Sequence, residues 1–106
     1  MSPQTISVHV QQDRAVVALR GEHEAYTADK LGKHVGALLD EGLPITIDLR
    51  EATFIDSTVV GVLITARRRA DERGLRLELL LGRDTGWPVR RLLEITGLEH
   101  QLRVVD

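Results

Sequence analysis

The group best placed to do chemistry in this sequence is the hydroxyl of Ser57, which follows Asp56 and begins an apolar, helix-like segment. Serine at the start of a helix commonly acts as the cap, because its oxygen accepts a hydrogen bond from a free backbone N–H. The same position favours a phosphate, since free N–H groups and the helix dipole stabilise an anion there by roughly 0.3–1 kcal/mol. Two roles for Ser57 therefore stay open, a helix cap and a phosphorylation site.

The helix predicted from Ser57 to Arg73 carries apolar residues on two faces. At about 100° per residue, one stripe forms the expected core face; its members are Val59, Val62, Leu63, Ala66 and Ala70. Val60 and Ile64 fall off this stripe, on the side that carries Ser57 and Gly61. Unless a neighbouring element covers them, exposed apolar groups around a polar centre are typical of a contact surface. We therefore expect a partner-binding surface here.

A phosphate on this surface would act as a switch. It would add roughly −1.5 to −2 charges to an apolar patch. A partner that docks there would have to bury or repel that charge, and about 1.4 kcal/mol already changes affinity tenfold. Phosphorylation of Ser57 could thus dissociate a complex without unfolding the protein.

Catalytic chemistry has little support. The chain has no cysteine, and no metal-binding spacing relates its four histidines, His9, His23, His34 and His100. The segment Phe54–Thr58 lacks the Gly-x-Ser-x-Gly motif of α/β hydrolases. His23–Glu24 could supply a general base, although a solvated loop pair is more common, and Asp48 lacks the acidic neighbours that hold Mg²⁺. We expect no enzyme, no metal site and no cofactor.

Composition excludes further classes of partner. With 14 basic against 16 acidic residues and one each of Phe, Trp and Tyr, the chain has neither the charge nor the stacking platform for nucleic acid. The longest mostly apolar run, Ser57–Ala66, is about half of a membrane span. The first residues lack the features of a signal peptide. We expect a cytoplasmic protein that binds neither nucleic acid nor membrane.

The order of segments predicts an α/β fold with one domain over residues 1–106, in which residues 1–4 are flexible. An N-terminal hairpin precedes βαβαβ-type units, which form a mixed, mostly parallel sheet packed by helices. The predicted strands are 6–10, 15–19, 45–49, 75–81 and 102–105, and the predicted helices follow Thr27, Asp56 and Trp87. Three loops, 20–27, 50–57 and 82–87, should meet at the carboxyl ends of the strands, where functional sites of such sheets lie.

Several local signals set the expected boundaries. Gly21 should end the second strand and start a polar loop over 22–26, with Thr27 as the cap of the first helix. Residues 50–56 should form a connector between the third strand and the second helix. Trp87 stands before Pro88 at the start of the third helix, where it is either a partner anchor or a partly buried core residue.

The segment Ile45–Leu63, ITIDLREATFIDSTVVGVL, resembles the signature of STAS domains of the anti-anti-sigma factor class. That signature has a hydrophobic strand ending in Asp-Leu, then an apolar residue, Asp-Ser, and a glycine in the following helix. Gly21–Glu22 and the segment Val89–Leu98 extend the resemblance, which runs from about Val8 to Val105.

The resemblance implies an anti-sigma factor antagonist, a bacterial regulator of transcription that works by partner switching. The unmodified protein would bind an anti-sigma factor that is also a serine kinase, and would thereby release the sigma factor. Phosphorylation of Ser57 would end this binding, and a metal-dependent serine phosphatase would restore it. The implied contact residues, together with the apolar pair described above, are Glu22, Glu24, Asp56, Ser57, Thr58, Val60, Gly61 and Ile64. Members of this family are mostly monomers, so we expect a monomer when the protein is free.

The sequence departs from the family pattern at three places. Val59 stands where members often have glycine, His23–Glu24 replaces an apolar residue followed by Asp, and Thr58 offers a second hydroxyl beside Ser57. An alternative therefore stays open: a STAS subunit of a lipid-transport ATPase complex, or a sensory scaffold, without a phosphorylation cycle.

Overall fold

An antiparallel hairpin opens the chain in the computed structural model, which describes residues 4–106. β1 (Thr5–Gln11) and β2 (Arg14–His23) are joined by a turn at Gln12 and Asp13. β1 lies at the edge of the sheet, where Ile6 is half-buried but Val8 and Val10 are exposed. The predicted hairpin is confirmed, whereas the expected half-burial of the first strand holds only at Ile6.

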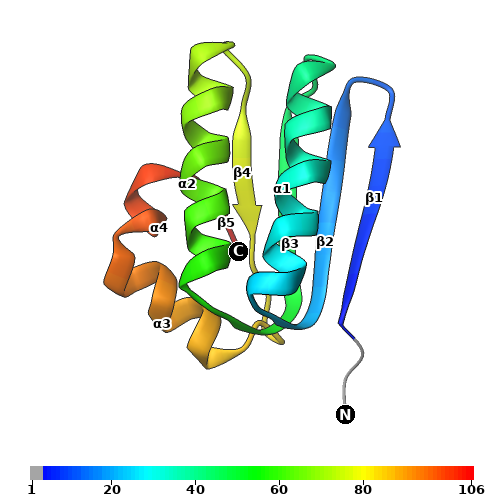
Figure 1. The fold of residues 1–106 in the computed structure, drawn as a ribbon. Coiled ribbons are helices and arrows are strands. Elements are labelled where there is room, and N and C mark those ends of the chain that lie inside the picture. The colour runs from blue at the N-terminus through cyan, green and yellow to red at the C-terminus, as the bar shows by residue number, and fades with distance from the viewer. Residues whose placement is uncertain (1–3) are drawn as a thin grey trace.

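The remaining strands run parallel to β2 and build a single sheet in the order β1-β2-β3-β4-β5 (Figure 1). They are β3 (Ile45–Ile55), β4 (Leu77–Leu80) and β5 (Arg103–Val105). The helices are α1 (Ala25–Asp40), α2 (Ser57–Glu72), α3 (Trp87–Thr96) and the short α4 (Leu98–Gln101), which sequence patterns did not predict. This arrangement confirms the predicted mixed, mostly parallel α/β fold. Residues 1–4 were expected to be flexible; residues 1–3 lie outside the described residues, so this expectation stays a prediction.

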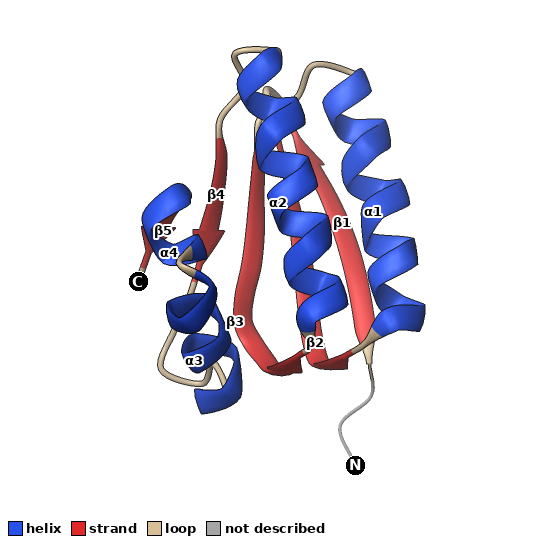
Figure 2. Cartoon of the chain, turned by 60° about the vertical axis from the view of Figure 1, so that its left-hand side comes forward, coloured by secondary structure: helices blue, strands red, loops and turns tan. Residues whose placement is uncertain are grey.

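The helices gather on one side of the sheet, with α2 between α1 and α3 (Figure 2). The core lies between these layers. The strands contribute alternate buried residues such as Val17, Ile47 and Leu79, and the helices contribute Leu31 and Leu63. Each such side chain stabilises the fold by roughly 1.5–3 kcal/mol through burial. None of the helices within residues 4–106 has the length and apolar character needed to span a membrane.

β2 and β3 are both longer than their sequence patterns predicted. β2 continues past Gly21, which has a φ of 83° and lies beside a register shift, and ends at His23. β3 continues through the predicted connector to Ile55. The two extensions pair with each other, since Glu22 lies opposite Phe54 and His23 opposite Ile55. The predictions of a loop over 22–26 and a connector over 50–56 are therefore wrong, because backbone pairing between distant segments forms these strands.

The first helix also begins earlier than predicted. Glu24 is the N-cap of α1, and Thr27 occupies the third helical position. The backbone N–H of Glu24 donates to Oγ1 of Thr27 at 3.1 Å, so Thr27 supports the cap from inside the helix. The prediction of Thr27 as the cap was three residues too late. The predicted core face of this helix, with Leu31, Val35 and Leu39, is buried as expected.

Candidate functional site

The three segments predicted as loops, 20–27, 50–57 and 82–87, meet at the carboxyl ends of β2 and β3, although much of the first two is strand. The backbone N–H of Asp56 donates to the carbonyl of His23 at 3.2 Å, and that of Gly86 donates to the carbonyl of Ala52 at 2.8 Å. Gly86 lies so close to β3 that an added Cβ would stand 2.1 Å from the carbonyl oxygen of Thr53. Only glycine fits at this position, and its close approach holds the start of α3 beside the start of α2.

Asp56, and not Ser57, is the N-cap of α2. A carboxylate oxygen of Asp56 accepts hydrogen bonds from the backbone N–H groups of Thr58 and Val59, at 3.0 and 3.3 Å, and from the hydroxyl of Thr58. These bonds, that from the Thr58 hydroxyl above all, lower the pKa of Asp56 below its ordinary value. The carboxylate is therefore ionised at neutral pH and holds the first turn of the helix.

Ser57 is consequently not needed as a cap. It occupies the first position of α2, its residue is exposed, and its hydroxyl makes no side-chain hydrogen bond with any part of the chain that the structure describes. Thr58 is exposed as well, but its hydroxyl is bound to Asp56. Of the two neighbouring hydroxyls, that of Ser57 is the more available to a reagent from solution.

The predicted apolar surface on α2 does not exist in the expected form. Val60 is buried, with 4% of its surface exposed, and Ile64 is half-buried against the core. Val62, which the helical wheel placed in the core, is instead half-buried beside α1, while Gly61 is exposed. The prediction that Val60 forms a contact surface is wrong. Because α2 has a helix on each side, more of its surface is buried than the single core-facing stripe that a helical wheel predicts, and the buried part includes Val60.

An apolar surface does adjoin Ser57, but α3 supplies it. A hollow of about 310 Å³ lies between the end of β3, the start of α2 and α3; its lining includes Phe54, Ser57, Trp87, Pro88, Leu92 and Ile95. Trp87 is 72% exposed and Ile95 is 64% exposed, which is unusual for such large apolar side chains. Of the two roles considered for Trp87, partial burial in the core is therefore wrong, and the exposed ring has the character of a partner anchor.

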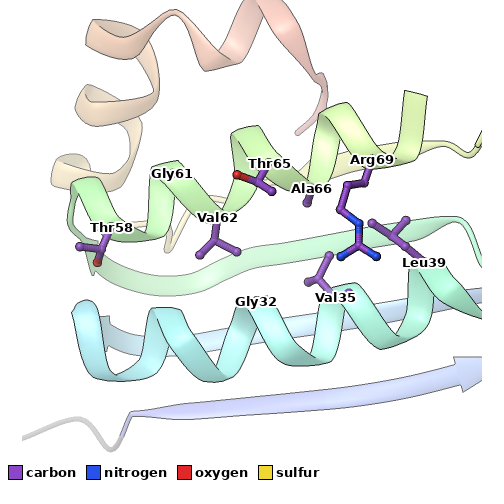
Figure 3. Close-up of a pocket in the computed structure, with 10 residues that line it drawn as sticks. Gly32, Val35, Leu39, Thr58, Gly61, Val62, Thr65, Ala66 and Arg69 are labelled. Carbon is purple, nitrogen blue, oxygen red and sulfur yellow. The ribbon is translucent and has the colours of Figure 1, made fainter. Parts of the chain in front are cut away.

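A second hollow, of about 420 Å³, separates α1 from α2 (Figure 3). Small residues create it, among them Gly32 and Gly36 on α1 and Gly61 on α2. The Arg69 side chain lies at the end of the groove away from Thr58 (Figure 3). An added Cβ on Gly36 would lie 2.9 Å from Nη1 of Arg69. Nη2 of Arg69 forms an ion pair with Asp40 at 2.7 Å. This groove is thus occupied partly by the protein's own side chains.

Glu22 and Glu24, the acidic residues that were predicted to lie at the carboxyl ends of the strands, are both exposed. His23 between them is 1% exposed, so it is not the solvated base that the sequence allowed. Its Nε2 lies 2.9 Å from the carbonyl oxygen of Arg20, while its Nδ1 has no hydrogen-bond partner within the described residues. Burial lowers the pKa of His23, because the charged ring would lose its hydration.

No group of three or more His, Cys, Asp or Glu side chains within residues 4–106 is arranged to hold a metal ion. The carboxyl end of β3 and the start of α2 instead combine the exposed Ser57, the ionised carboxylate of Asp56 that caps the helix, and a neighbouring apolar hollow. Such an arrangement can accept a modifying group and bind another protein.

The chain is similar to known proteins in sequence and in fold. Residues 6–106 match the family described as "Mlab, STAS domain". Over 103 residues the chain is 32% identical to an anti-sigma-B factor antagonist of Listeria monocytogenes. The alignment covers 93% of this chain and 88% of the relative.

Two solved structures share the fold. An anti-sigma factor antagonist from Mycobacterium paratuberculosis has a TM-score of 0.83 at 22% identity, covering 98% of this chain and 86% of the other. The Bacillus cell fate determinant SpoIIAA, solved in its phosphorylated form, has a TM-score of 0.74 at 18% identity, covering 96% and 92%.

Proposed function

This chain belongs to the STAS domain family, in the class of the anti-sigma factor antagonists, and we propose that it works by partner switching controlled at Ser57. Proteins of this class are regulatory binding proteins and not enzymes. In the proposed cycle the unmodified protein binds an anti-sigma factor with serine kinase activity in the cytoplasm and so releases a sigma factor. Phosphorylation of Ser57 ends this binding, and a metal-dependent serine phosphatase restores it.

The observation that carries the proposal is the exposed Ser57 hydroxyl, which the cap at Asp56 leaves available. A kinase can reach this oxygen without opening the helix. The similarity in fold to SpoIIAA, a protein that has been solved in a phosphorylated form, also supports it. Thr58 is the second choice of acceptor, because its hydroxyl would first have to leave Asp56.

The surroundings of Ser57 explain how one phosphate could prevent docking. The hollow beside Ser57 is lined mainly by apolar side chains, and the carboxylate of Asp56 already places one negative charge at its border. Arg91 also lines the hollow, but it is already paired with Glu94 at 2.8 Å. A phosphate would add roughly −1.5 to −2 charges beside that carboxylate. A partner that covers Trp87 and Ile95 would then have to desolvate these charges together, which disfavours the complex by several kcal/mol.

Glu22 and Glu24 are part of the same proposal. Both are exposed at the end of β2, beside the extended part of β3 that leads to Ser57. The partner-binding surface that we propose therefore includes these carboxylates, the half-buried Ile64 and the hollow on α3, together with four residues at the start of α2: Asp56, Ser57, Thr58 and Gly61. The buried Val60 is not part of it.

Phosphate mapping tests the proposed cycle. The protein is incubated with ATP and the candidate anti-sigma factor kinase of its own organism, and the modified residue is identified by mass spectrometry. We expect phosphate on Ser57 and its loss in Ser57→Ala. Phosphate on neither Ser57 nor Thr58 would instead favour a STAS subunit of a lipid-transport ATPase complex or a sensory scaffold. The three departures from the family pattern, at Val59, His23–Glu24 and Thr58, are the features that favour this alternative.

Calorimetric titration tests the charge switch itself. Ser57→Asp should weaken binding to the kinase by about tenfold or more, while the melting temperature stays nearly unchanged. Ser57→Asn is the matched control, because it has nearly the same size without the charge, and it should bind almost as well as the unmodified protein. Equal affinity of all three proteins would contradict the proposed switch.

A further inference from the structure

The outer edge of β1 has unused backbone hydrogen-bonding groups. β1 is the terminal strand of the sheet and pairs only with β2 among the described residues. The N–H of Ala15 donates to Pro44 on the β3 side, so the even-numbered residues of β2 direct their backbone groups toward β1. Their partners in β1 are Thr5, Ser7, His9 and Gln11. The backbone groups of the alternating residues Ile6, Val8 and Val10 therefore point away from the sheet.

This edge lacks the features that usually prevent strands from pairing. β1 has seven residues, TISVHVQ, with no proline and no Lys, Arg, Asp or Glu. It runs against β2 without a register shift. Val8 is 37% exposed and Val10 is 59% exposed on the face that the helices cover elsewhere. A regular, uncharged edge strand with exposed apolar residues is a template for another strand.

The sequence of β1 is complementary to itself. If two copies meet antiparallel with Val8 opposite Val8 of the second copy, Ile6 lies opposite Val10, Ser7 opposite His9, and Thr5 opposite Gln11. Apolar residues then face apolar residues on one face, and polar residues face polar residues on the other. In this register the residues whose backbone groups point outward, Ile6, Val8 and Val10, are also the ones that form hydrogen-bonded pairs.

We propose that a second copy of this chain binds along β1, so that the two sheets continue into one across a two-fold axis at Val8. This inference does not depend on the proposed phosphorylation cycle, and it replaces the monomer that the family resemblance led us to expect. β1 and α3 lie on opposite sides of the molecule (Figure 1), so in each copy Ser57 and the hollow on α3 stay accessible. The dimer therefore presents two partner-binding surfaces. Because only one strand from each copy forms the contact, we expect a weak dimer, with a dissociation constant between about 1 µM and 1 mM.

Sedimentation equilibrium of the full chain over about 1 µM to 1 mM tests the proposal. The weight-average mass should rise from monomer to dimer over this range. Val8→Lys, which places two like charges at the two-fold axis, and Val10→Lys should each weaken association by about tenfold or more. Gln101→Lys, which adds the same charge at an exposed position on α4, should associate like the unchanged protein. A monomer mass at every concentration would overturn the proposal, as would equal association of all four proteins.

A cysteine pair tests the register. The chain has no cysteine, so Val8→Cys introduces a single thiol. In the proposed dimer the two Cα atoms at position 8 are about 5.5 Å apart, within the range of a disulfide. Oxidised glutathione should therefore convert Val8→Cys to a covalent dimer much faster than Val10→Cys, whose thiol faces Ile6 of the second copy. Equal rates for the two variants would contradict this register.

Discussion

The two hollows beside α2 differ in what occupies them. The groove toward α1 is lined by small residues and is crossed by the Arg69 side chain, which pairs with Asp40. The hollow toward α3 leaves Trp87 and Ile95 mostly exposed and has no comparable ion pair across it among the described residues. The neighbouring hydroxyls follow the same division, since Thr58 lines the first hollow and Ser57 the second.

This difference indicates which side of α2 serves recognition. On the α1 side, polar groups are already satisfied within the protein, Thr58 by Asp56 and Arg69 by Asp40. On the α3 side, a serine hydroxyl and large apolar side chains face solvent together. Partner binding on the α3 side therefore gains more buried apolar area and displaces fewer existing interactions.

The largest expected effect concerns Val60, which lies in the core of α2. Val60→Glu buries a charge without a partner, so we expect a loss of roughly 3–5 kcal/mol in the free energy of unfolding, or failure to fold. Urea denaturation measures this loss. Thr65→Glu, at an exposed position on the same helix, is the control and should change stability by less than about 0.5 kcal/mol. Similar stability of the two variants would show that Val60 is not part of the core.

Truncation on the two sides of α2 tests the comparison directly. Trp87→Ala should weaken binding of the anti-sigma factor by roughly 2 kcal/mol or more, about thirtyfold, because exposed tryptophan is a typical binding anchor. Arg69→Ala should leave that affinity unchanged and reduce stability by about 0–1 kcal/mol, since its ion pair is exposed. Calorimetric titration separates the two. A larger loss of affinity in Arg69→Ala would move the recognition surface to the α1 side.

Removal of the cap at α2 should have a smaller effect. Asp56→Ala leaves the N–H groups of Thr58 and Val59 without their acceptor, and we expect a loss of about 0.5–2 kcal/mol in stability. Ser57→Ala should have almost no effect, because the Ser57 hydroxyl does not cap the helix. A matching loss of stability in Ser57→Ala would show that Ser57 shares the capping role.

The smallest expected effect is a dependence of stability on pH. Burial lowers the pKa of His23 in the folded protein, whereas the unfolded chain keeps the ordinary value of 6.5. Below that pH the unfolded state binds a proton that the folded state does not, so the free energy of unfolding decreases as the pH is lowered. The decrease is at most about 1.4 kcal/mol per pH unit and stops once the pH is below the pKa of His23 in the folded state. His23→Gln should lose less stability than the unchanged protein between pH 7 and 5. His9→Gln, at an exposed position, is the matched control for the loss of one histidine side chain.

Local sequence signals determined much of the fold. The spacing of Leu31, Val35 and Leu39 predicted the buried face of α1, and Pro88 and Gly97 marked the two ends of α3. The start of α2 at Ser57 was also predicted correctly. Helix periodicity, caps and turns depend on neighbours within a few residues, so they can be read from the chain alone.

Only the tertiary structure decided which apolar groups are covered. Val60 is buried, the reverse of what the helical wheel predicted, because helices flank α2 on both sides. Trp87 is exposed, which the sequence had left open, because no described element covers it. The extensions of β2 and β3 likewise depend on each other, since neither polar segment forms a strand without the other's backbone. Burial and strand pairing are set by residues far apart in sequence, and their partners become known only when the chain has folded.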